Sequence, residues 1–294
     1  MDVQKMPFEA VYQAFEEHML LKNFALATRK TYLSNFRRYY QWTLESEVDK
    51  PYDQDVVRRY LLYRVRKGAK WQTMNSIYSA MRKLFREVLD LDWSLRKLPR
   101  PNKERHLPEL ISRQEVMLLI KTCRHLKHQA MIVTLYATGL RAGELSRLKL
   151  DHIDARRLQI RVVKGKGAKD RYVNVPEQLI VYLRQYYKAY RPVTYLFNGK
   201  RKGEPLSLSA MRWPLRQAKS ELGWTKKISP HTLRHCYATH HLETGTDLVF
   251  LKQNMGHKHL KTTARYIHLC KDRYQHINHP IAEMIPHLMH RTMD

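Results

Sequence analysis

One basic, proline-containing stretch constrains the fold of this chain more than any other sequence feature, because it divides the chain into two parts. The residues from Asp92 to Pro108, DWSLRKLPRPNKERHLP, include three prolines and five Lys or Arg. Proline and the residue before it disfavour helix, so the stretch predicts an extended linker. Ser112 then starts a fresh helical pattern, with Glu115 placed as in a capping box, which puts a boundary near residue 106. At 294 residues, the chain is long enough for a domain on each side.

Both sides of the stretch are mainly helical by pattern. Apolar residues recur at three- and four-residue spacing along the first side, as in Leu33, Phe36 and Tyr40. The second side also carries one β signal, because RLQIRVV and RYVNV alternate around the Gly-rich KGKGAKD (164–170), which predicts a hairpin. The helices predicted after it span about 177–190, 207–222, 230–243 and 248–255.

The positive charge is the main clue to a partner. The chain has 54 Lys and Arg against 27 Asp and Glu, a net charge of +27 and a pI near 10.1. The excess is not a tail, since there are 21 basic against 13 acidic residues as far as Arg105 and 33 against 14 beyond it. Such self-repulsion disfavours a compact state unless a polyanion shares the surface, so we expect nucleic acid first and an anionic membrane second. A hydrophobic content of 43% argues against disorder.

The cysteines and the N-terminus bear on the compartment. Cys123, Cys236 and Cys270 cannot all pair and form no CxxC, which excludes a disulfide scaffold and favours a reducing environment. MDVQKMPFEA has no apolar signal region, and the longest apolar stretch, near 130–137, is too short to cross a bilayer. We therefore expect a cytoplasmic protein.

Two predicted helix starts carry cationic side chains. In TGLRAGEL, Gly139 ends one helix and Arg141 falls at the start of the next, where a cation is unfavourable unless an anion lies nearby. In SPHTLRH, the favoured caps Ser229 and Pro230 are followed by His231-x-x-Arg234, an arrangement suited to a phosphate. Taken singly, Arg141 is better explained as a solvated surface arginine, and a capped helix with polar side chains in solvent is the alternative for the second start.

Further residues extend this pattern toward the C-terminus. Gly256-His257 is followed nine residues later by Tyr266. The hairpin turn carries Lys164, Lys166 and Lys169; a lysine on a glycine turn approaches a phosphate closely, although a polar hairpin tip is commoner. There is no GxxxxGK[ST] phosphate-binding loop. His231 and His235 have zinc-like spacing, but no Glu or Cys completes the set, so we expect no metal site.

Together and in order, these motifs resemble the active-site set of the tyrosine recombinases, the phage-integrase family, and the short Xer-like and transposon-type members most. The flanks GKGAKDRYVNVP, HTLRHCYATH and GHKHLKTTARYIH are similar too, and the resemblance covers about residues 8–270. It implies a mainly α fold with a small β-hairpin or sheet, in two domains that form a C-shaped clamp. The implied parts are an α-helical, SAM-like core-binding domain over 1–95, a basic linker over 96–108, an α+β catalytic domain over 109–275 and a C-terminal helix over 276–294.

The resemblance implies a site-specific recombinase or integrase that cleaves and rejoins DNA through a 3′-phosphotyrosyl intermediate and a Holliday junction. Tyr266 would be the nucleophile, and Arg141 and Arg234 would hold the non-bridging phosphate oxygens. Lys166 would be the general acid for the 5′-hydroxyl, with Lys164 and Lys169 as alternatives. His231 would assist as acid or base, and His257 would hydrogen-bond the phosphate.

Elementary chemistry agrees with these roles. A tyrosine, with a pKa near ~10, needs a base or a strongly cationic site to act as a nucleophile. Arginine binds two phosphate oxygens with its planar fork and favours the more highly charged transition state. Such cations replace what a metal ion otherwise supplies, and a covalent link conserves the bond energy. We therefore expect no metal, ATP or other cofactor.

The charge pattern and the resemblance together predict which residues contact DNA and how the protein assembles. Arg29, Lys30, Arg37 and Arg38 are candidate contacts to duplex DNA in the first half, as are Lys164 and Lys169 on the hairpin; solvated charges look the same in sequence. Apolar residues after Pro280 follow helical spacing. By resemblance, this tail docks on a neighbouring protomer of a homo-tetramer on a recombination site, the alternative being a helix packed within its own protomer.

Two other functions are compatible with the same motifs. One is a catalytically silent DNA-binding or architectural protein, which would have no need of Tyr266. The other is strand relaxation of the type IB topoisomerase kind, with the same nicking chemistry in one protomer. The two-domain size and the apolar tail favour the oligomeric recombinase. Integration or transposition of a mobile element and resolution of chromosome dimers both remain open, as does the DNA sequence.

Overall fold

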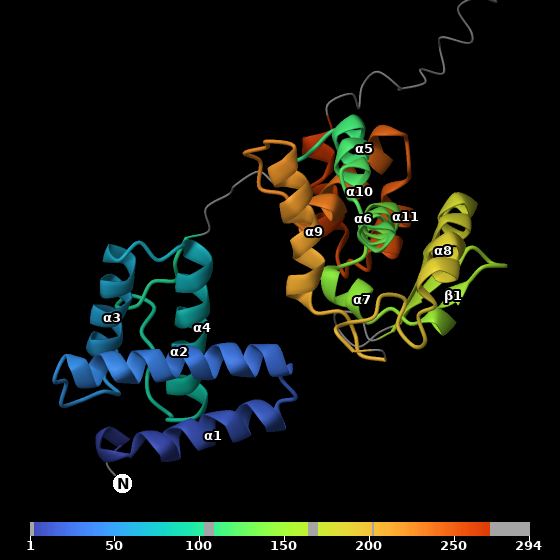
Figure 1. The fold of residues 1–294 in the computed structure, drawn as a ribbon. Helices are drawn as coiled ribbons and strands as arrows, with labels where there is room; N and C mark the ends of the chain where they lie inside the picture. Colours follow the sequence, from blue (N-terminus) through green and yellow to red (C-terminus); the bar gives the residue numbers. More distant parts are fainter. Residues whose placement is uncertain (1–2, 103–108, 164–169, 202, 271–294) are drawn as a thin grey trace, which may run out of the picture. The chain divides into compact units, whose positions relative to one another are not determined.

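The computed structural model describes residues 3–102, 109–163, 170–201 and 203–270. Contacts divide the chain into two units, one up to residue 106 and one from residue 107. Figure 1 shows both units as mainly helical, as the sequence predicts, with a small sheet in the second. Among the described residues no helix is both long and apolar enough to cross a membrane.

The first unit is a bundle of helices around an aromatic-rich core. Its helices are η1 (Val3–Lys5), α1 (Phe8–Leu21), α2 (Leu26–Glu45), α3 (Gln54–Arg66) and α4 (Trp71–Glu87). Phe15, Phe36 and Phe85 are fully buried, and Tyr39 donates its hydroxyl to the carbonyl of Pro51. The packing extends past α4, because Trp93 and Leu98 are both buried in this core. The first part of the proline-containing stretch is therefore folded onto the first unit.

The second unit surrounds one central helix. Its elements are α5 (Arg113–Lys121), α6 (Leu126–Thr138), α7 (Ala142–Ser146), η2 (Leu150–His152), β1 (Ile153–Asp154), β2 (Gln159–Val162), β3 (Arg171–Asn174), α8 (Glu177–Tyr190), α9 (Leu208–Glu221), α10 (Pro230–Glu243), α11 (Leu248–Met255), α12 (Leu260–Ala264) and η3 (Ile267–Leu269). Helix α6 packs against α5, α8, α9 and α10, which explains why its buried residues are not confined to one stripe.

The predicted hairpin is confirmed, and a short third strand joins it. Strands β2 and β3 pair antiparallel, with Ile160 opposite Val173 and Val162 opposite Arg171, and β1 adds to the other edge of β2. The residues that alternate inward, Ile160, Val162 and Val173, are buried. Most of the turn, 164–169, lies outside the described residues.

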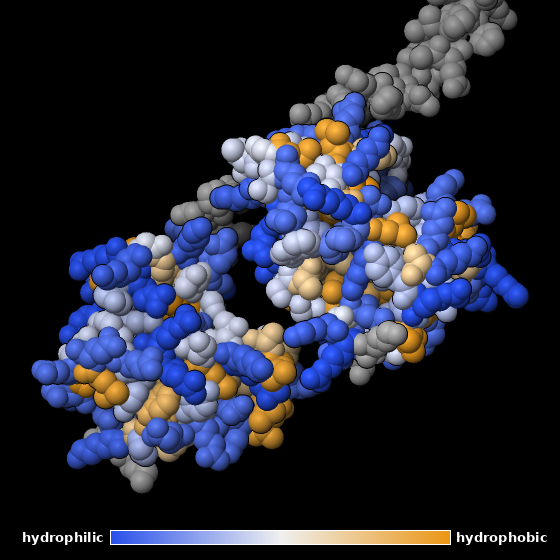
Figure 2. Space-filling view, in the orientation of Figure 1, coloured by the Kyte–Doolittle hydropathy of each residue, from blue (hydrophilic) through white to orange (hydrophobic). Residues whose placement is uncertain are grey.

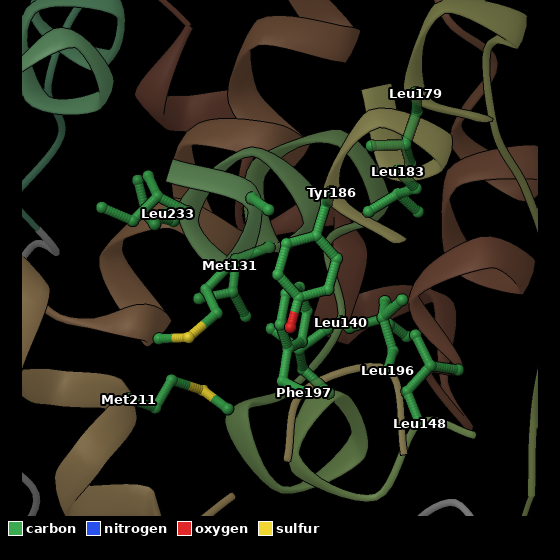
Figure 3. Packing of buried hydrophobic residues seen from close by; sticks show 14 of the residues in the cluster. Met131, Leu140, Leu148, Leu179, Leu183, Tyr186, Leu196, Phe197, Met211 and Leu233 are labelled. Atoms are coloured by element: carbon green, nitrogen blue, oxygen red, sulfur yellow. The ribbon is translucent and has the colours of Figure 1, made fainter. Parts of the chain in front are cut away.

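The core of the second unit joins its helices to the sheet. Figure 3 shows Tyr186 of α8 and Phe197 packed among leucines and the two methionines Met131 and Met211. Cys123 and Cys236 are buried thiols and Cys270 is half-buried, and none of the three forms a disulfide. Figure 2 shows a mostly hydrophilic surface on each unit, with apolar side chains scattered across it, as the charge count predicts.

Candidate active site

A left-handed glycine positions Arg141. Helix α6 ends at Thr138, Gly139 has φ of 60°, and α7 begins after Arg141. A Cβ on Gly139 would lie 2.8 Å from Cε1 of Tyr237 and closer still to Cδ1, so only glycine allows this close approach to α10. The chain therefore turns sharply enough to direct Arg141 toward the second half of the unit, where its guanidinium lies 3.5 Å from the carbonyl of Gly256.

One buried carboxylate joins Arg141 to a second arginine. Glu144 accepts hydrogen bonds from the backbone and the guanidinium of Arg141, at 2.8 and 2.9 Å, and from both terminal nitrogens of Arg171, at 2.9 and 2.8 Å. Burial alone would raise the pKa of Glu144, but the hydrogen bonds and charge of Arg171, together with Arg141, lower it to about 2. The carboxylate is ionised at neutral pH and holds both arginines in place.

Arg171 is a site residue that the sequence motifs do not include. It sits on β3, on the same face as the buried Val173, and its Nε donates to the carbonyl of Asn254 at 3.0 Å. The available signal was an arginine on the inward face of a strand, since a buried charge needs a partner or a function.

Arg234 is the most deeply buried cation of the site. The predicted caps of α10 are confirmed, with Ser229 at the N-cap and Pro230 in the first position. One turn later Arg234, only 1% exposed, donates to the carbonyls of Gly139 and Met255 and lies 2.9 Å from Nε2 of His257. Burial, followed by the charge of Arg141, lowers its pKa to about 10. It is still a cation at pH 7, and its fork is fixed by backbone carbonyls.

His257 is held on both sides of its ring. Gly256 ends α11 with φ of 62°, and a Cβ there would lie 2.8 Å from Cδ and Nε of Arg171. Nε2 of His257 faces Arg234, and Nδ1 lies 2.9 Å from Oγ1 of Thr263. Burial, and then the charges of Arg234, Arg141, Arg171 and Arg265, lower the pKa of His257 to about 4. The imidazole is therefore neutral at pH 7.

Tyr266 completes the cluster. It follows α12, is 6% exposed, and its ring stacks parallel to that of His257 with centroids 6.2 Å apart. Its hydroxyl lies 3.1 Å from Nδ1 of His235. Burial raises the pKa of Tyr266, while Arg234, Arg265 and Arg141 act in the opposite direction. His231, which the resemblance gives as an acid or base, is exposed, and its ring packs against that of His235 with the centroids 4.3 Å apart.

The structure thus brings together Arg141, Arg234, His257 and Tyr266, with His231 next to His235 at their edge. Lys164, Lys166 and Lys169 lie outside the described residues. Glu144 pairs with Arg141 and Arg171, and Arg234 forms no ion pair among the described residues, so the cluster holds a surplus of positive charge beside a tyrosine hydroxyl. Such a site is suited to bind a phosphate and to stabilise added negative charge on it. In the described part of the chain no three His, Cys, Asp or Glu side chains are grouped as metal ligands.

A second cationic site lies on the first unit. A hollow beside α4 is lined by Tyr32 of α2, by Tyr78, Ser79, Arg82, Lys83, Arg86 and Glu87 of α4, and by Arg100. Glu87 accepts from His18, Lys22 and Lys83, whereas Arg82 and Arg86 have no ion-pair partner among the described residues. The hollow is therefore positively charged, and the sequence motifs did not indicate it.

The cations that the sequence did indicate on α2 differ in their surroundings. Arg29 lies one turn before Tyr32, is half-buried, and its Nε has no hydrogen-bond partner in the described structure. Arg37 stacks on the ring of Tyr12 and donates to its hydroxyl at 3.2 Å. Lys30 and Arg38 are exposed.

Comparison with known proteins gives two family matches. Residues 109–273 match the phage integrase family, and residues 11–95 match the phage integrase N-terminal SAM-like domain. A protein of Sinorhizobium fredii named as an integrase/recombinase is 34% identical over 93% of this chain and 89% of its own length. The tyrosine recombinase XerD of Pseudomonas putida is 32% identical over 85% of this chain and 89% of its own length.

Solved structures agree with these matches. The XerA recombinase structure is 27% identical, covers 97% of this chain and 100% of its own, and has a TM-score of 0.51. A lambda integrase dimer bound to a core site is 16% identical, with a TM-score of 0.73 over 93% of this chain and 80% of its own, a likeness of fold.

Proposed function

The chain belongs to the phage integrase family and is a tyrosine recombinase, and from this premise we propose that it cuts and rejoins duplex DNA at a specific site through a 3′-phosphotyrosyl bond. The observation that carries the proposal is the surplus of positive charge beside Tyr266, where Arg141, Arg171 and Arg234 gather with one carboxylate, Glu144, which pairs with the first two. A phosphodiester is the anion that this arrangement fits best.

Each step assigns a role to a residue of the site. Arg141 and Arg234 bind the non-bridging oxygens of the scissile phosphate, which carry more charge in the transition state than in the ground state. Tyr266 attacks phosphorus, the bond to the 5′ oxygen breaks, and Lys166 protonates the leaving 5′-hydroxyl. His231 supports the proton transfers, and His257 orients Arg234 and the phosphate. The guanidinium groups neutralise the developing charge, and the covalent link keeps the bond energy, so neither a metal ion nor ATP is needed.

The partner is double-stranded DNA, and relatives support this. Solved structures of the same fold include a transposon integrase with circular-intermediate DNA and a XerH recombinase bound to its substrate. Both units are proposed to contact the duplex, the first through the hollow lined by Arg82, Arg86 and Arg100, together with Arg29, Lys30, Arg37 and Arg38, on the phosphate backbone. Lys164 and Lys169 would contact the duplex from the second unit.

Recombination joins two DNA sites, so we propose a homo-tetramer that exchanges strands through a Holliday junction. The C-terminal helix proposed over 276–294 would dock on a neighbouring protomer; these residues lie outside the described structure. We propose domains over 1–95, 109–275 and 276–294 and a linker over 96–108, the start of which, as far as Leu98, packs on the first domain.

A trapping assay tests the proposal. Wild type and Tyr266→Phe are incubated, with and without EDTA, with DNA that flanks the gene, quenched in SDS, and examined for a protein–DNA band that protease destroys. We expect the band with wild type alone, whether or not EDTA is present, and equal binding by both proteins. A band with Tyr266→Phe would contradict the assignment of the nucleophile, and loss of the band in EDTA would point to a metal nuclease. Binding without any band, even on a nicked suicide substrate, would favour a silent DNA-binding protein.

A further inference from the structure

The side chain that touches the hydroxyl of Tyr266 is His235, a residue outside the predicted active-site set. Nδ1 of His235 lies 3.1 Å from Oη of Tyr266, and the centroids of the two rings are 5.5 Å apart. His235 follows Arg234 directly on α10, so the helix that fixes the phosphate-binding arginine also fixes this imidazole. Tyr266 is 6% exposed, which leaves little bulk water to take its proton.

The other histidines nearby are less suited to contact this hydroxyl. His257 uses Nε2 with Arg234 and Nδ1 with Thr263, so neither nitrogen is free for Tyr266. His231 is exposed, and its described contact is with the ring of His235. A base has to lie within hydrogen-bond reach of the proton that it removes, and among the described residues His235 meets that condition.

The surroundings of His235 keep it unprotonated. Burial, and then the charges of His231, Arg265 and Arg234, lower its pKa to about 4. The groups that face it are therefore His231 and Arg234 on its own helix and Arg265 and Tyr266 from the segment after α12. A neutral imidazole at pH 7 can accept a proton. A phosphodiester bound to Arg141 and Arg234 would bring negative charge to this cluster and increase the basicity of the ring when the reaction needs it.

We infer that His235 is the general base that takes the phenolic proton of Tyr266 during strand cleavage. This rests on the proposed function. The proton moves from Oη of Tyr266 to Nδ1 of His235, the bond from Oη to phosphorus forms, and the bond from phosphorus to the 5′ oxygen breaks. The leaving oxygen takes its proton from the general acid proposed at Lys166. In rejoining, Lys166 takes back the proton of the 5′-hydroxyl as its oxygen attacks phosphorus, the bond from phosphorus to Oη breaks, and His235 returns the proton to the departing Tyr266.

The matched variant is His235→Asn. The amide of asparagine places a hydrogen-bonding atom where Nδ1 of histidine lies, so the contact with Tyr266 is kept while basicity is lost. His241→Ala is the control, because His241 is half-buried on the same helix and bonds to Thr246 instead. The substrate is a nicked duplex made from the fragment on which wild type forms its covalent adduct, and the measurement is the single-turnover rate of adduct formation from pH 5 to 9.

We expect His235→Asn and His235→Ala to form the adduct about 10²- to 10⁴-fold more slowly at pH 7, with a rate that rises about tenfold per pH unit because hydroxide replaces the base. His241→Ala should match wild type. In a second substrate, sulfur replaces the bridging 5′ oxygen, so that the leaving group needs no general acid. On this substrate we expect Lys166→Ala to regain its rate of adduct formation, whereas the His235 variants should stay slow.

The outcomes separate the two proposals. Wild-type rates and pH dependence for His235→Asn, with wild type forming the adduct, would overturn the role of His235 and leave the recombinase intact. Recovery of the His235 variants on the sulfur substrate would also overturn it, since their defect would then concern the leaving group. Failure of wild type to form any adduct while it binds DNA would overturn the proposed function and this inference together. Unchanged circular dichroism for His235→Asn shows that the variant is folded.

Discussion

Nη2 of Arg234 lies 2.9 Å from Nε2 of His257, and this contact sets the state of the histidine. A guanidinium can only donate, so Nε2 accepts and the ring proton sits on Nδ1, directed at Oγ1 of Thr263. The tautomer follows from the partners, and the pKa of about 4 agrees with a neutral ring. In this arrangement His257 orients Arg234, and a phosphate has to take over one of these contacts to be bound by the histidine.

Acidification should destabilise the second unit in a defined window. The pKa values of His235 and His257 are lowered to about 4 in the folded protein, against ~6.5 in the unfolded chain. The unfolded state therefore binds more protons between about pH 6.5 and 4, and stability falls as the pH drops through that range. Thermal unfolding from pH 7.5 to 4.5 should show this fall, and it should be shallower in His257→Gln. Nitrogen-15 NMR that finds His257 charged at pH 6 would contradict it.

The planar guanidinium of Arg234 should matter for the reaction rate beyond the positive charge that it carries. Arg234→Lys keeps a cation but cannot donate to the carbonyls of Gly139 and Met255 and also contact His257. We expect adduct formation to fall by about 100-fold or more in both Arg234→Lys and Arg234→Ala. Single-turnover rates check this, with DNA affinity measured alongside. A lysine variant within a few-fold of wild type would mean that charge alone suffices.

Glu144 should stabilise the unit only while it is ionised. Its pKa is lowered to about 2 in the folded protein by Arg171 and Arg141, against burial, so its contribution is present above pH 4.5 and is lost as the pH falls toward 2. Glu144→Gln should therefore lower the melting temperature clearly at pH 7 and by much less at pH 3. Glu221→Gln is a suitable control, because its pairing with Arg124 is long and exposed. An equal effect of Glu144→Gln at both pH values would contradict the assigned ion pair.

Gly139 should not tolerate a side chain. Gly139→Ala meets both a left-handed backbone and a close approach of the new Cβ to the ring of Tyr237, whereas Gly223, with φ of 63°, has no atom within 4 Å of the place that its Cβ would take. Gly223→Ala should cost about 1 kcal/mol from the backbone alone. Gly139→Ala should cost more, and should slow adduct formation because the carbonyl of Gly139 holds Arg234. Equal unfolding free energies in urea would contradict the close approach.

The basic hollow of the first unit should contribute to binding without sequence preference. Replacing Arg82 or Arg86 by Ala should weaken DNA binding and reduce the slope of log affinity against log salt by about 0.9 for each phosphate that is no longer neutralised. Lys97→Ala removes the same charge from the same unit at an exposed residue paired with Asp55, and should leave the slope nearly unchanged. Titrations over a range of salt concentrations measure this, and identical slopes for Arg86→Ala and wild type would contradict the proposed role of the hollow.

The sequence by itself determined the local structure and the order of the motifs. The N-caps at Ser112 and Ser229, the alternation that pairs Ile160 with Val173, and the glycines that end α6 and α11 act over a few residues, so short patterns specify them. Together with the family resemblance, the same patterns pointed to Arg141, Arg234 and Tyr266, but not to Arg171. The packing of Trp93 and Leu98 onto the first unit was not visible, because prolines and charges dominate that stretch.

Only the tertiary structure decided which groups meet. The resemblance pointed to His231, with His235 one turn away on α10, and the packing of α10 against the segment after α12 brings His235 to Tyr266, 31 residues away. Arg171 on β3 joins Glu144 on α7, 27 residues earlier in the chain. Such contacts depend on the orientation of whole elements, which the burial of their apolar faces fixes and which no local spacing encodes.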